Sequence, residues 1–312
     1  MVASKRQIWR AGSRDQKDLL FVCLMALLPL LHFAIFYVGV NLNSILLAFK
    51  SYSSNDKWSF VGLQNFRELF DDFSRYTLYK TALKNSALVF GIGMPVSTIL
   101  GFLFSYYIYK SQTHFGNFMK IVLFLPSIIP SIALATIFVQ VADSAIPRFF
   151  SEIFHRDILG LFQNPKLTIY TIIFYNVWVS FGPNMLLFLN AMNGVNKEVI
   201  EAAKIDGAGF FREMRSITLP QCYGILQTLL IVSLGGFFVN TASIVSFYGT
   251  SAEERVYTIG YYLYVQTVLN ASSYTQLPKL AAFGILLTCI TIPVVYLVKL
   301  VMDHFDPNRS RA

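Results

Sequence analysis

Charged side chains are scarce in this sequence. Lysine, arginine, aspartate and glutamate make up 13% of its 312 residues, whereas a soluble domain carries about 25%. Hydrophobic residues account for 55% of the chain, and phenylalanine alone contributes 29 residues. This composition argues against an ordinary soluble domain and indicates a protein that resides in a membrane.

Motifs for catalysis and metal binding are lacking as well. The sequence has no G-x-x-x-x-G-K-[ST] loop, so it carries no Walker site for binding and hydrolysing ATP, and it has neither HExxH nor G-x-S-x-G. Its cysteines, Cys23, Cys222 and Cys289, lie far apart in or beside apolar runs and predict no disulfide framework and no metal site. We therefore expect no catalytic residue, no metal site, no bound cofactor and no enzymatic activity of the chain's own.

Long apolar runs, by contrast, are abundant. A helix needs about 20 mainly apolar residues to cross the hydrocarbon core, and six stretches qualify. The predicted fold is an all-α membrane protein with an N-terminal tail at residues 1–18, a six-helix transmembrane domain at 19–302 and a C-terminal tail at 303–312. The first apolar run is too long for a cleavable signal peptide. The six predicted spans are about residues 19–40, 85–109, 118–142, 168–192, 221–246 and 280–301.

Proline and glycine recur inside these runs. Membrane bundles tolerate proline, because neighbouring helices can satisfy the carbonyls that it frees. Small residues let helix backbones approach each other closely. The positions expected to do so are Gly91, Gly93, Gly101, Gly235 and Gly236.

The basic residues indicate an orientation. The net charge is +8, but no nucleic-acid-binding motif occurs, and lysine and arginine cluster in the N-terminal tail and between the apolar runs. The tails and the loops after spans two and four hold about 14 of these residues, against about 11 over the longer remaining loops, which predicts cytoplasmic termini. The external loop 51–84 is expected to contain a short amphipathic helix, lying on the membrane, under a partner or against the bundle. Its apolar positions are Leu63, Phe66, Leu69, Phe70 and Phe73.

The cytoplasmic loop 193–220 is predicted to form two short helices. Asn196 is a good N-cap, and Val195 and Ile200 stand at the two positions of a hydrophobic staple. The first helix should run over 197–205 and end at Gly207 in a left-handed conformation. A second helix over 208–217 should carry Phe210, Phe211, Met214 and Ile217 on one face, with Arg212, Glu213 and Arg215 elsewhere, and Pro220 can open span five.

Two interpretations of this loop stay open on the residues alone. Small, exposed Ala202 and Ala203 would let the groove of a partner approach, and Glu201 and Asp206 would supply charges for pairing. An ordinary interfacial loop would have the same composition.

The sequence EAAKIDGA, followed by ITLP, closely resembles the EAA motif of permease subunits in type I ABC importers. The positions that match are Glu201, Ala202, Ala203, Gly207, Ile217, Leu219 and Pro220. The segments FVGLQNFRELF, LFLPSIIPSIALATIF and WVSFGPNMLLFLNAMNGV look like the carbohydrate-type subfamily. Residues 247–277 depart from it, because FYGTSAEERVYT stands where that family often has a Gly-Gly-Pro loop.

The resemblance implies a function and a set of partners. The chain would be one of two permease subunits in a bacterial inner membrane, paired with a distinct paralogue and surrounded by lipid. Two cytoplasmic ATPase subunits would use ATP and Mg²⁺, and an extracytoplasmic binding protein would deliver a carbohydrate. The residues implied in coupling to the ATPase are Glu201, Ala202, Ala203, Asp206, Gly207, Leu219 and Pro220.

Polar residues within the spans are candidates for contact with the solute. A sugar needs aromatic faces and amide or hydroxyl groups in a concave site, although polar residues in spans also form interhelical hydrogen bonds. The candidates are Asn176, Trp178, Asn184, Asn190, Asn240 and Ser243. Apart from His32 in span one, we expect no ionisable group deep in a span, so the energy for transport should come from elsewhere. An ATP-independent channel or facilitator, and a membrane scaffold or receptor component, remain the alternatives.

Overall fold

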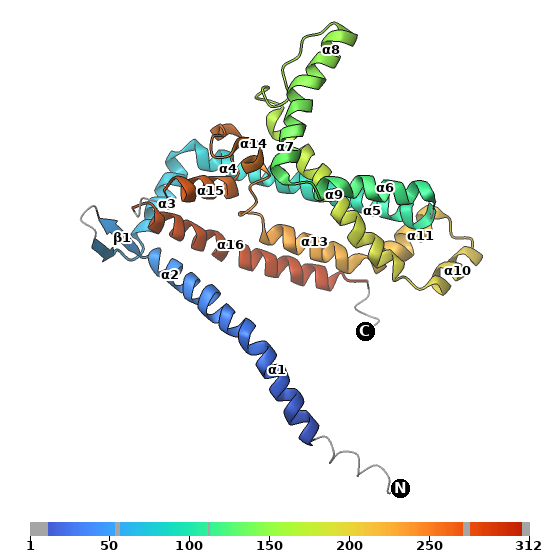
Figure 1. The fold of residues 1–312 in the computed structure, drawn as a ribbon, viewed down its shortest axis with the longest axis horizontal. Coiled ribbons are helices and arrows are strands. Elements are labelled where there is room, and N and C mark those ends of the chain that lie inside the picture. Colours follow the sequence, from blue (N-terminus) through green and yellow to red (C-terminus); the bar gives the residue numbers. More distant parts are fainter. Residues whose placement is uncertain (1–11, 54–56, 112, 271–274, 308–312) are drawn as a thin grey trace. The chain divides into compact units, whose positions relative to one another are not determined.

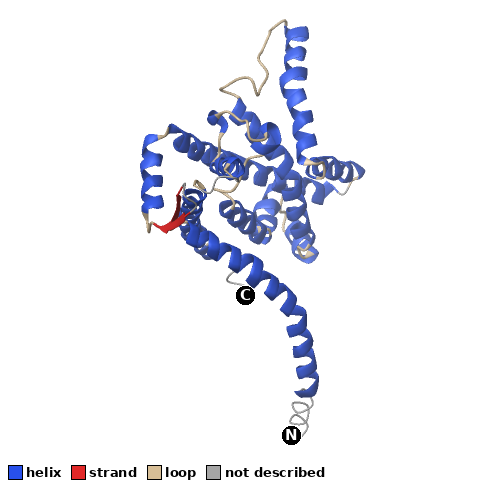
Figure 2. Ribbon diagram, turned by 60° about the vertical axis from the view of Figure 1, so that its left-hand side comes forward, coloured by secondary structure: helices blue, strands red, loops and turns tan. Residues whose placement is uncertain are grey.

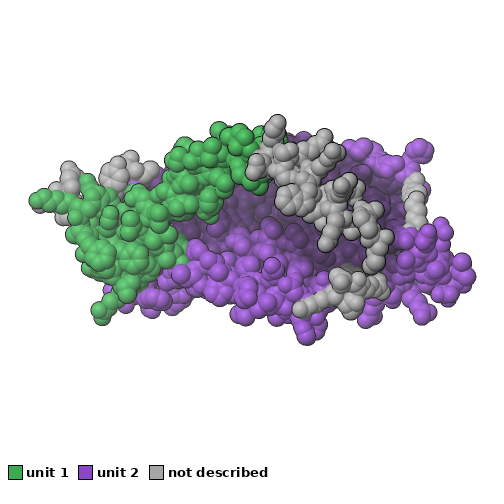
Figure 3. All heavy atoms as spheres, turned by 90° about the horizontal axis from the view of Figure 1, so that it is seen from below, with its two compact units in different colours: residues 1–68, 273–285 green, residues 69–272, 286–312 purple. Residues whose placement is uncertain are grey.

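The computed structural model describes residues 12–53, 57–111, 113–270 and 275–307. The first 11 residues of the predicted N-terminal tail and the last five of the C-terminal tail lie outside this range. The chain divides into two compact units (Figure 3): residues 1–68 with 273–285, and residues 69–272 with 286–312. We refer to them as unit 1 and unit 2.

Unit 1 begins with one long apolar helix. It consists of α1 (Gly12–His32), the π-helical stretch η1 (Phe33–Gly39) and α2 (Val40–Leu47) (Figure 1). Its candidate membrane span, Asp18–Leu47, has 30 residues, about 45 Å at 1.5 Å per residue. The first predicted span is therefore confirmed, and the helix continues beyond its predicted end to Leu47.

A hairpin that the sequence did not predict follows in unit 1. Strands β1 (Lys50–Ser53) and β2 (Lys57–Phe60) pair antiparallel, with Lys50 opposite Phe60. They form the only sheet among the described residues (Figure 2). The Asn65 side chain donates to the carbonyls of Ala48 (2.7 Å) and Lys50 (2.9 Å) and so holds the base of the hairpin. Asn65 belongs to α3 (Gln64–Arg75), the predicted amphipathic helix, which continues into unit 2.

Two long helices form the centre of unit 2. The first joins α4 (Thr77–Leu88), the π-helical turn η2 (Val89–Gly93) and α5 (Met94–Ser111) into one span of 35 residues. The second, α9 (Thr168–Asn193), has 26 residues. These spans confirm the predicted second and fourth helices. A Cβ at Gly101 of α5 would lie 3.0 Å from the Asn184 Cβ of α9, so the two backbones are in close contact.

The predicted third span, residues 118–142, is wrong. The chain forms α6 (His114–Phe124), the 3-10 turn η3 (Leu125–Ser127) and then a new helix composed of α7 (Ser131–Gln140), η4 (Val141–Ala145) and α8 (Ile146–Phe154). Pro126 and Pro130 lie at this break and favour it, because proline donates no backbone hydrogen bond and disfavours helix in the residue before it. The candidate span is therefore Ser131–Phe154.

This shift places an acidic residue inside a candidate span, against expectation. Asp143 lies midway along Ser131–Phe154, and its Oδ1 accepts a hydrogen bond of 2.8 Å from the backbone N–H of Phe162 in the returning loop. Glycine is required at 160, because a Cβ there would lie 2.5 Å from the same oxygen. Asp143 thus fastens the loop to the helix.

The predicted fifth span, 221–246, is also wrong at its C-terminal end. Helix α11 (Phe210–Glu213), the π-helical turn η5 (Met214–Thr218) and α12 (Leu219–Gln221) lead into α13 (Tyr223–Gly235) through a bend of 60°. Pro220 lies before this bend and not at the start of α13. The chain leaves the helix at Gly235 and Gly236 and continues through α14 (Ile244–Tyr248), η6 (Glu254–Val256) and α15 (Ile259–Leu269).

The last helix, α16 (Leu277–His304), confirms the predicted sixth span and extends it at both ends. Its later part lies in unit 2, where the Tyr223 hydroxyl donates to the carbonyl of Met302 at 2.8 Å. The described residues thus contain five helices that are long and apolar enough to cross a membrane, and six if the bent pair counts as one span. The protein is an all-α membrane protein apart from its short hairpin.

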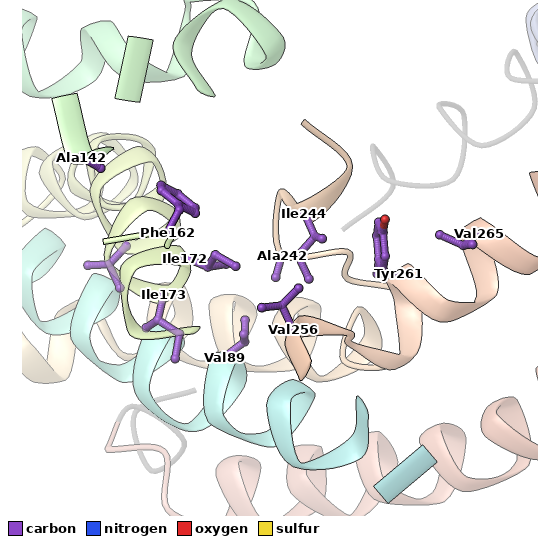
Figure 4. Close-up of a cluster of buried hydrophobic side chains, with 11 residues drawn as sticks. Val89, Ala142, Phe162, Ile172, Ile173, Ala242, Ile244, Val256, Tyr261 and Val265 are labelled. Carbon is purple, nitrogen blue, oxygen red and sulfur yellow. The ribbon is translucent and has the colours of Figure 1, made fainter. Parts of the chain in front are cut away.

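The largest buried apolar cluster of unit 2 joins α9 to the segment that follows α13 (Figure 4). Within the segment that follows α13 the backbone is also closely packed, because a Cβ at Gly260 of α15 would clash with the Val239 carbonyl oxygen. The expectation for close-contact glycines is confirmed at Gly101 only. A Cβ at Gly91, Gly93 or Gly235 would meet nothing within 4 Å, and one at Gly236 would meet only ordinary contacts. The labelled side chains of the cluster are Val89, Ala142, Phe162, Ile172, Ile173, Ala242, Ile244, Val256, Tyr261 and Val265.

Candidate functional site

The loop 193–220, which we call the elbow, begins with a well-capped helix. In α10 (Lys197–Ile205) the Asn196 side chain accepts a hydrogen bond of 2.9 Å from the backbone N–H of Glu198. This confirms Asn196 as the N-cap. Val195 and Ile200, the predicted staple residues, are both buried. The entry of the chain into α10 is therefore fixed on both its polar and its apolar side.

The end of α10 is fixed by a glycine-dependent turn. The N–H of Ala208 donates to the carbonyl of Ala203 at 2.9 Å, and the N–H of Gly207 donates to that of Lys204 at 3.1 Å. These two bonds make a Schellman motif, which requires a left-handed residue at position 207. Gly207 has φ +75°, so the prediction is confirmed. A Cβ at this position would meet no atom within 4 Å, so backbone conformation alone demands glycine.

One face of α10 is apolar and uncovered in the isolated chain. Val199, Ala202 and Ile205 lie three residues apart on this face, and 87% of the Ile205 surface is exposed. Glu201 and Asp206 are exposed beside them, whereas Ala203 is half-buried. Leu219 and Pro220 lie apart from this face, in α12. The exposed face with its flanking acidic residues has the composition of a docking surface.

An ion pair with a buried carboxylate joins the second half of the elbow to the end of α5. Lys110 Nζ lies 2.6 Å and 2.7 Å from the two carboxylate oxygens of Glu213. Nearby, the Tyr106 hydroxyl donates to the carbonyl of Phe210 at 3.1 Å. The sequence placed Glu213 on a polar face, but only 2% of its surface is exposed. No local pattern could reveal this contact, because 103 residues separate its partners.

A cavity of about 500 Å³, lined by apolar side chains together with several amide and hydroxyl groups, lies elsewhere in unit 2. Three of the predicted pathway residues, Asn176, Asn184 and Asn240, line it. Trp178 instead packs with Phe138 and Tyr175, and Asn190 is exposed near the end of α9; neither lines the cavity. The remaining polar lining residues, which the sequence analysis missed, are Ser86, Ser97, Thr98, Ser180, Ser233 and Thr258.

Asn176 also holds a strained turn beside the cavity. Its amide nitrogen donates to the carbonyl of Ala242 and its amide oxygen accepts from the Ser243 hydroxyl, both at 2.9 Å. Ala242 and Ser243 have φ of 51° and 59°, a conformation that costs about 1–2 kcal/mol for a residue with a side chain. Asn240 Oδ1 accepts a further bond from the Ala242 N–H at 2.8 Å. Asn176 and Ser243 thus take part in structural hydrogen bonds that join α9 to the turn before α14.

Comparison with known proteins identifies the class to which this arrangement belongs. A family model described as the inner membrane component of binding-protein-dependent transport systems matches residues 93–311. The sn-glycerol-3-phosphate transport system permease protein UgpA of Yersinia pseudotuberculosis serotype I is 30% identical over 190 residues, which cover 60% of this chain and 62% of UgpA. UgpA of Salmonella typhimurium is 30% identical over 189 residues, with the same coverage. The chain thus matches less than two thirds of the length of these relatives.

Solved structures share the fold over nearly the whole chain. A bacterial ABC transporter involved in the import of the acidic polysaccharide alginate has a TM-score of 0.79 and 21% identity, covering 96% of this chain and 99% of that one. The alginate transporter in complex with a periplasmic protein bound to an alginate pentasaccharide has a TM-score of 0.73 and 19% identity, with coverage of 96% and 98%. By the extent of its family match, this chain belongs to the inner membrane components of binding-protein-dependent transport systems.

Proposed function

We propose that this chain is a membrane-spanning permease subunit of an ATP-binding cassette importer and forms part of the pathway for a carbohydrate. The exposed apolar face of α10 carries the proposal. Ile205 is almost fully exposed. Burial of such a side chain by a partner would contribute about 1.5–3 kcal/mol of binding free energy. The rigid caps at Asn196 and Gly207 hold that face in one orientation before a partner binds.

The elbow is the site at which we expect an ATPase subunit to dock. It stands at one end of unit 2, away from α15 (Figure 1). The small side chain of Ala202 would let the wall of a groove on the ATPase subunit approach α10 closely. Glu201 and Asp206 would pair with basic residues at the edge of that groove. ATP and Mg²⁺ would act in two such subunits. Binding of ATP would then favour the conformation in which the two elbows lie closer together.

The cavity supports a hydroxylated solute. Its polar lining consists of amide and hydroxyl groups, which suit the hydroxyls of a sugar or polyol. UgpA is named for sn-glycerol-3-phosphate, and the solved transporter imports alginate, so related proteins handle polyhydroxylated solutes. A second permease subunit, a distinct paralogue, would complete the pathway, and an extracytoplasmic binding protein would deliver the solute.

This proposal requires the elbow to face the cytoplasm. With six spans both chain termini would lie on the same side of the membrane, and the density of lysine and arginine favours the cytoplasm as that side. The bacterial inner membrane is then the site of action.

Two arginine substitutions at the elbow test the proposal. Glu201→Arg and Gly207→Arg should each reduce the amount of ATPase subunit that copurifies with the tagged chain from detergent-solubilised membranes of its own host. The first removes the charge partner, and the second adds a side chain at a left-handed position. Glu152→Arg, on the exposed surface of α8, is the matched control and should leave copurification unchanged. Equal recovery of the ATPase with all three variants would show that the elbow is not its docking site.

A further inference from the structure

We propose that the Lys110–Glu213 ion pair transmits movement of the elbow to α5 and thereby to the cavity. This inference rests on the proposed function, because the movement originates in an ATPase docked at α10. The elbow is joined covalently to α9 at its start and to α13 at its end. The ion pair adds a third, non-covalent joint, to a helix that is far away in sequence.

Several short contacts between the elbow and α5 make this joint rigid. Both carboxylate oxygens of Glu213 lie within 2.7 Å of Lys110 Nζ, and only 3% of the Glu213 side chain is exposed. The Tyr106 hydroxyl bonds to the Phe210 carbonyl, and the two rings lie 4.7 Å apart. The elbow and α5 thus meet through an ion pair, a hydrogen bond and an aromatic contact within one turn of each. The Lys110 side chain is 24% exposed, but separation would leave the buried Glu213 carboxylate without its charge partner, so the pair resists separation.

Helix α5 connects this joint with the cavity. Ser97 and Thr98, on the same helix as Lys110, line the cavity. Thirteen residues separate Ser97 from Lys110, about 20 Å along a helix axis. A displacement imposed at Lys110 therefore reaches the cavity wall through a single helix.

Close packing makes α5 and α9 move together. The Ser105 hydroxyl of α5 lies 2.5 Å from the Met185 carbonyl oxygen of α9. A Cβ at Gly101 would lie 3.1 Å from the Met185 backbone nitrogen, so little space separates the two backbones. Asn184, also on α9, lines the cavity and donates a hydrogen bond to Ser97 Oγ at 3.4 Å. The ion pair thus joins the elbow to α5, and through α5 to the closely packed pair of α5 and α9.

The test measures cavity access in the assembled complex, without a transported solute. Ser233→Cys places a thiol in the cavity wall on α13, in a background without the three native cysteines. Its reaction rate with a membrane-impermeant maleimide is measured in inverted vesicles that contain the whole transporter. The rate is compared with and without trapping by Mg-ATP and vanadate. If the cavity is coupled to the ATPase, trapping should change the rate at which the thiol at position 233 reacts with the maleimide by about fivefold or more.

Four variants of the ion pair and one control are combined with this reporter. Lys110→Met and Glu213→Gln should lose most of the ATP-dependent change while retaining the ATPase subunits in the complex. Lys110→Arg, and the exchange of Lys110→Glu with Glu213→Lys, should restore it, because either keeps an ion pair at the joint. Lys166 is an exposed lysine in the turn before α9, and Lys166→Met is the control, which should behave like the parent.

Two results would overturn the inference. One is a full ATP-dependent change in maleimide reaction rate in both Lys110→Met and Glu213→Gln. The other is a loss of that change that neither Lys110→Arg nor the exchange restores. Absence of copurifying ATPase from the parent chain would instead refute the proposed function. Gel filtration of each variant in detergent, monitored by a fluorescent tag, confirms that the compared proteins are folded.

Discussion

Replacing Gly207 with alanine isolates the contribution of one backbone conformation to the elbow. The glycine has φ +75°, and a Cβ there would meet no atom within 4 Å, so the substitution adds backbone strain and no steric clash. A left-handed conformation costs a residue with a side chain about 1–2 kcal/mol. Relief of that strain would break the two hydrogen bonds that end α10 and would move Ile205 and Asp206. We therefore expect Gly207→Ala to weaken binding of the ATPase by up to about 5–30-fold.

The chain supplies a matched control two residues away. Gly209 has φ −73° and ψ 170°, an ordinary extended conformation, and it too has nothing within 4 Å of its Cβ position. Gly209→Ala should therefore bind like the parent, and Gly207→Asn should lie between Gly207→Ala and the parent, because asparagine tolerates the left-handed region. The assay is titration of purified ATPase subunit against the permease complex in lipid nanodiscs. Equal affinities of Gly207→Ala and Gly209→Ala would refute the role assigned to this turn.

Three further predictions concern unit 2. Gly182→Ala should lower the melting temperature in detergent, because its Cβ would clash with the Leu123 carbonyl oxygen, whereas Gly91→Ala should not; equal melting temperatures would contradict the packing described. Asn176→Leu should reduce unfolding stability by roughly 1–3 kcal/mol, because it removes two hydrogen bonds from the strained turn, and denaturant titration measures this loss. Ser233→Phe should fill part of the cavity and abolish solute-dependent growth while leaving the ATPase bound; unimpaired growth would place the pathway elsewhere.

Local chemistry made the first half of the elbow predictable. A short polar side chain at 196 and a glycine at 207 delimit an amphipathic segment, and both termini of α10 follow from that pattern. Such caps depend on contacts within a few residues, which a sequence displays directly. The existence and order of the apolar helices follow in the same way from run length.

Breaks inside apolar runs were harder to predict. Proline is tolerated in membrane helices when neighbours satisfy the freed carbonyls, so the sequence could not show that Pro126 and Pro130 would end a helix. The same uncertainty applies at Gly235, where the fifth span leaves its helix about ten residues before the apolar run ends. In both places tertiary packing decides between a kink and a break.

Contacts between distant segments could not be predicted at all. The pattern of the second elbow helix places Glu213 with Arg212 and Arg215 on a polar face, and only the fold shows that Glu213 is buried against Lys110. The cavity likewise draws its hydroxyl groups from serine and threonine residues on several helices. These residue types are common in any membrane helix, so nothing in the sequence distinguishes the ones that meet.

The most direct test of the central claim is a photo-crosslinking measurement at Ile205. A photoreactive amino acid at position 205, in the chain expressed in its own host, should form a covalent adduct with a nucleotide-binding subunit on illumination of intact cells. The same amino acid at Ile153, an exposed isoleucine of α8, should form none. An adduct with that subunit at 153 and not at 205, or at neither position, would contradict the assignment of α10 as the ATPase docking site.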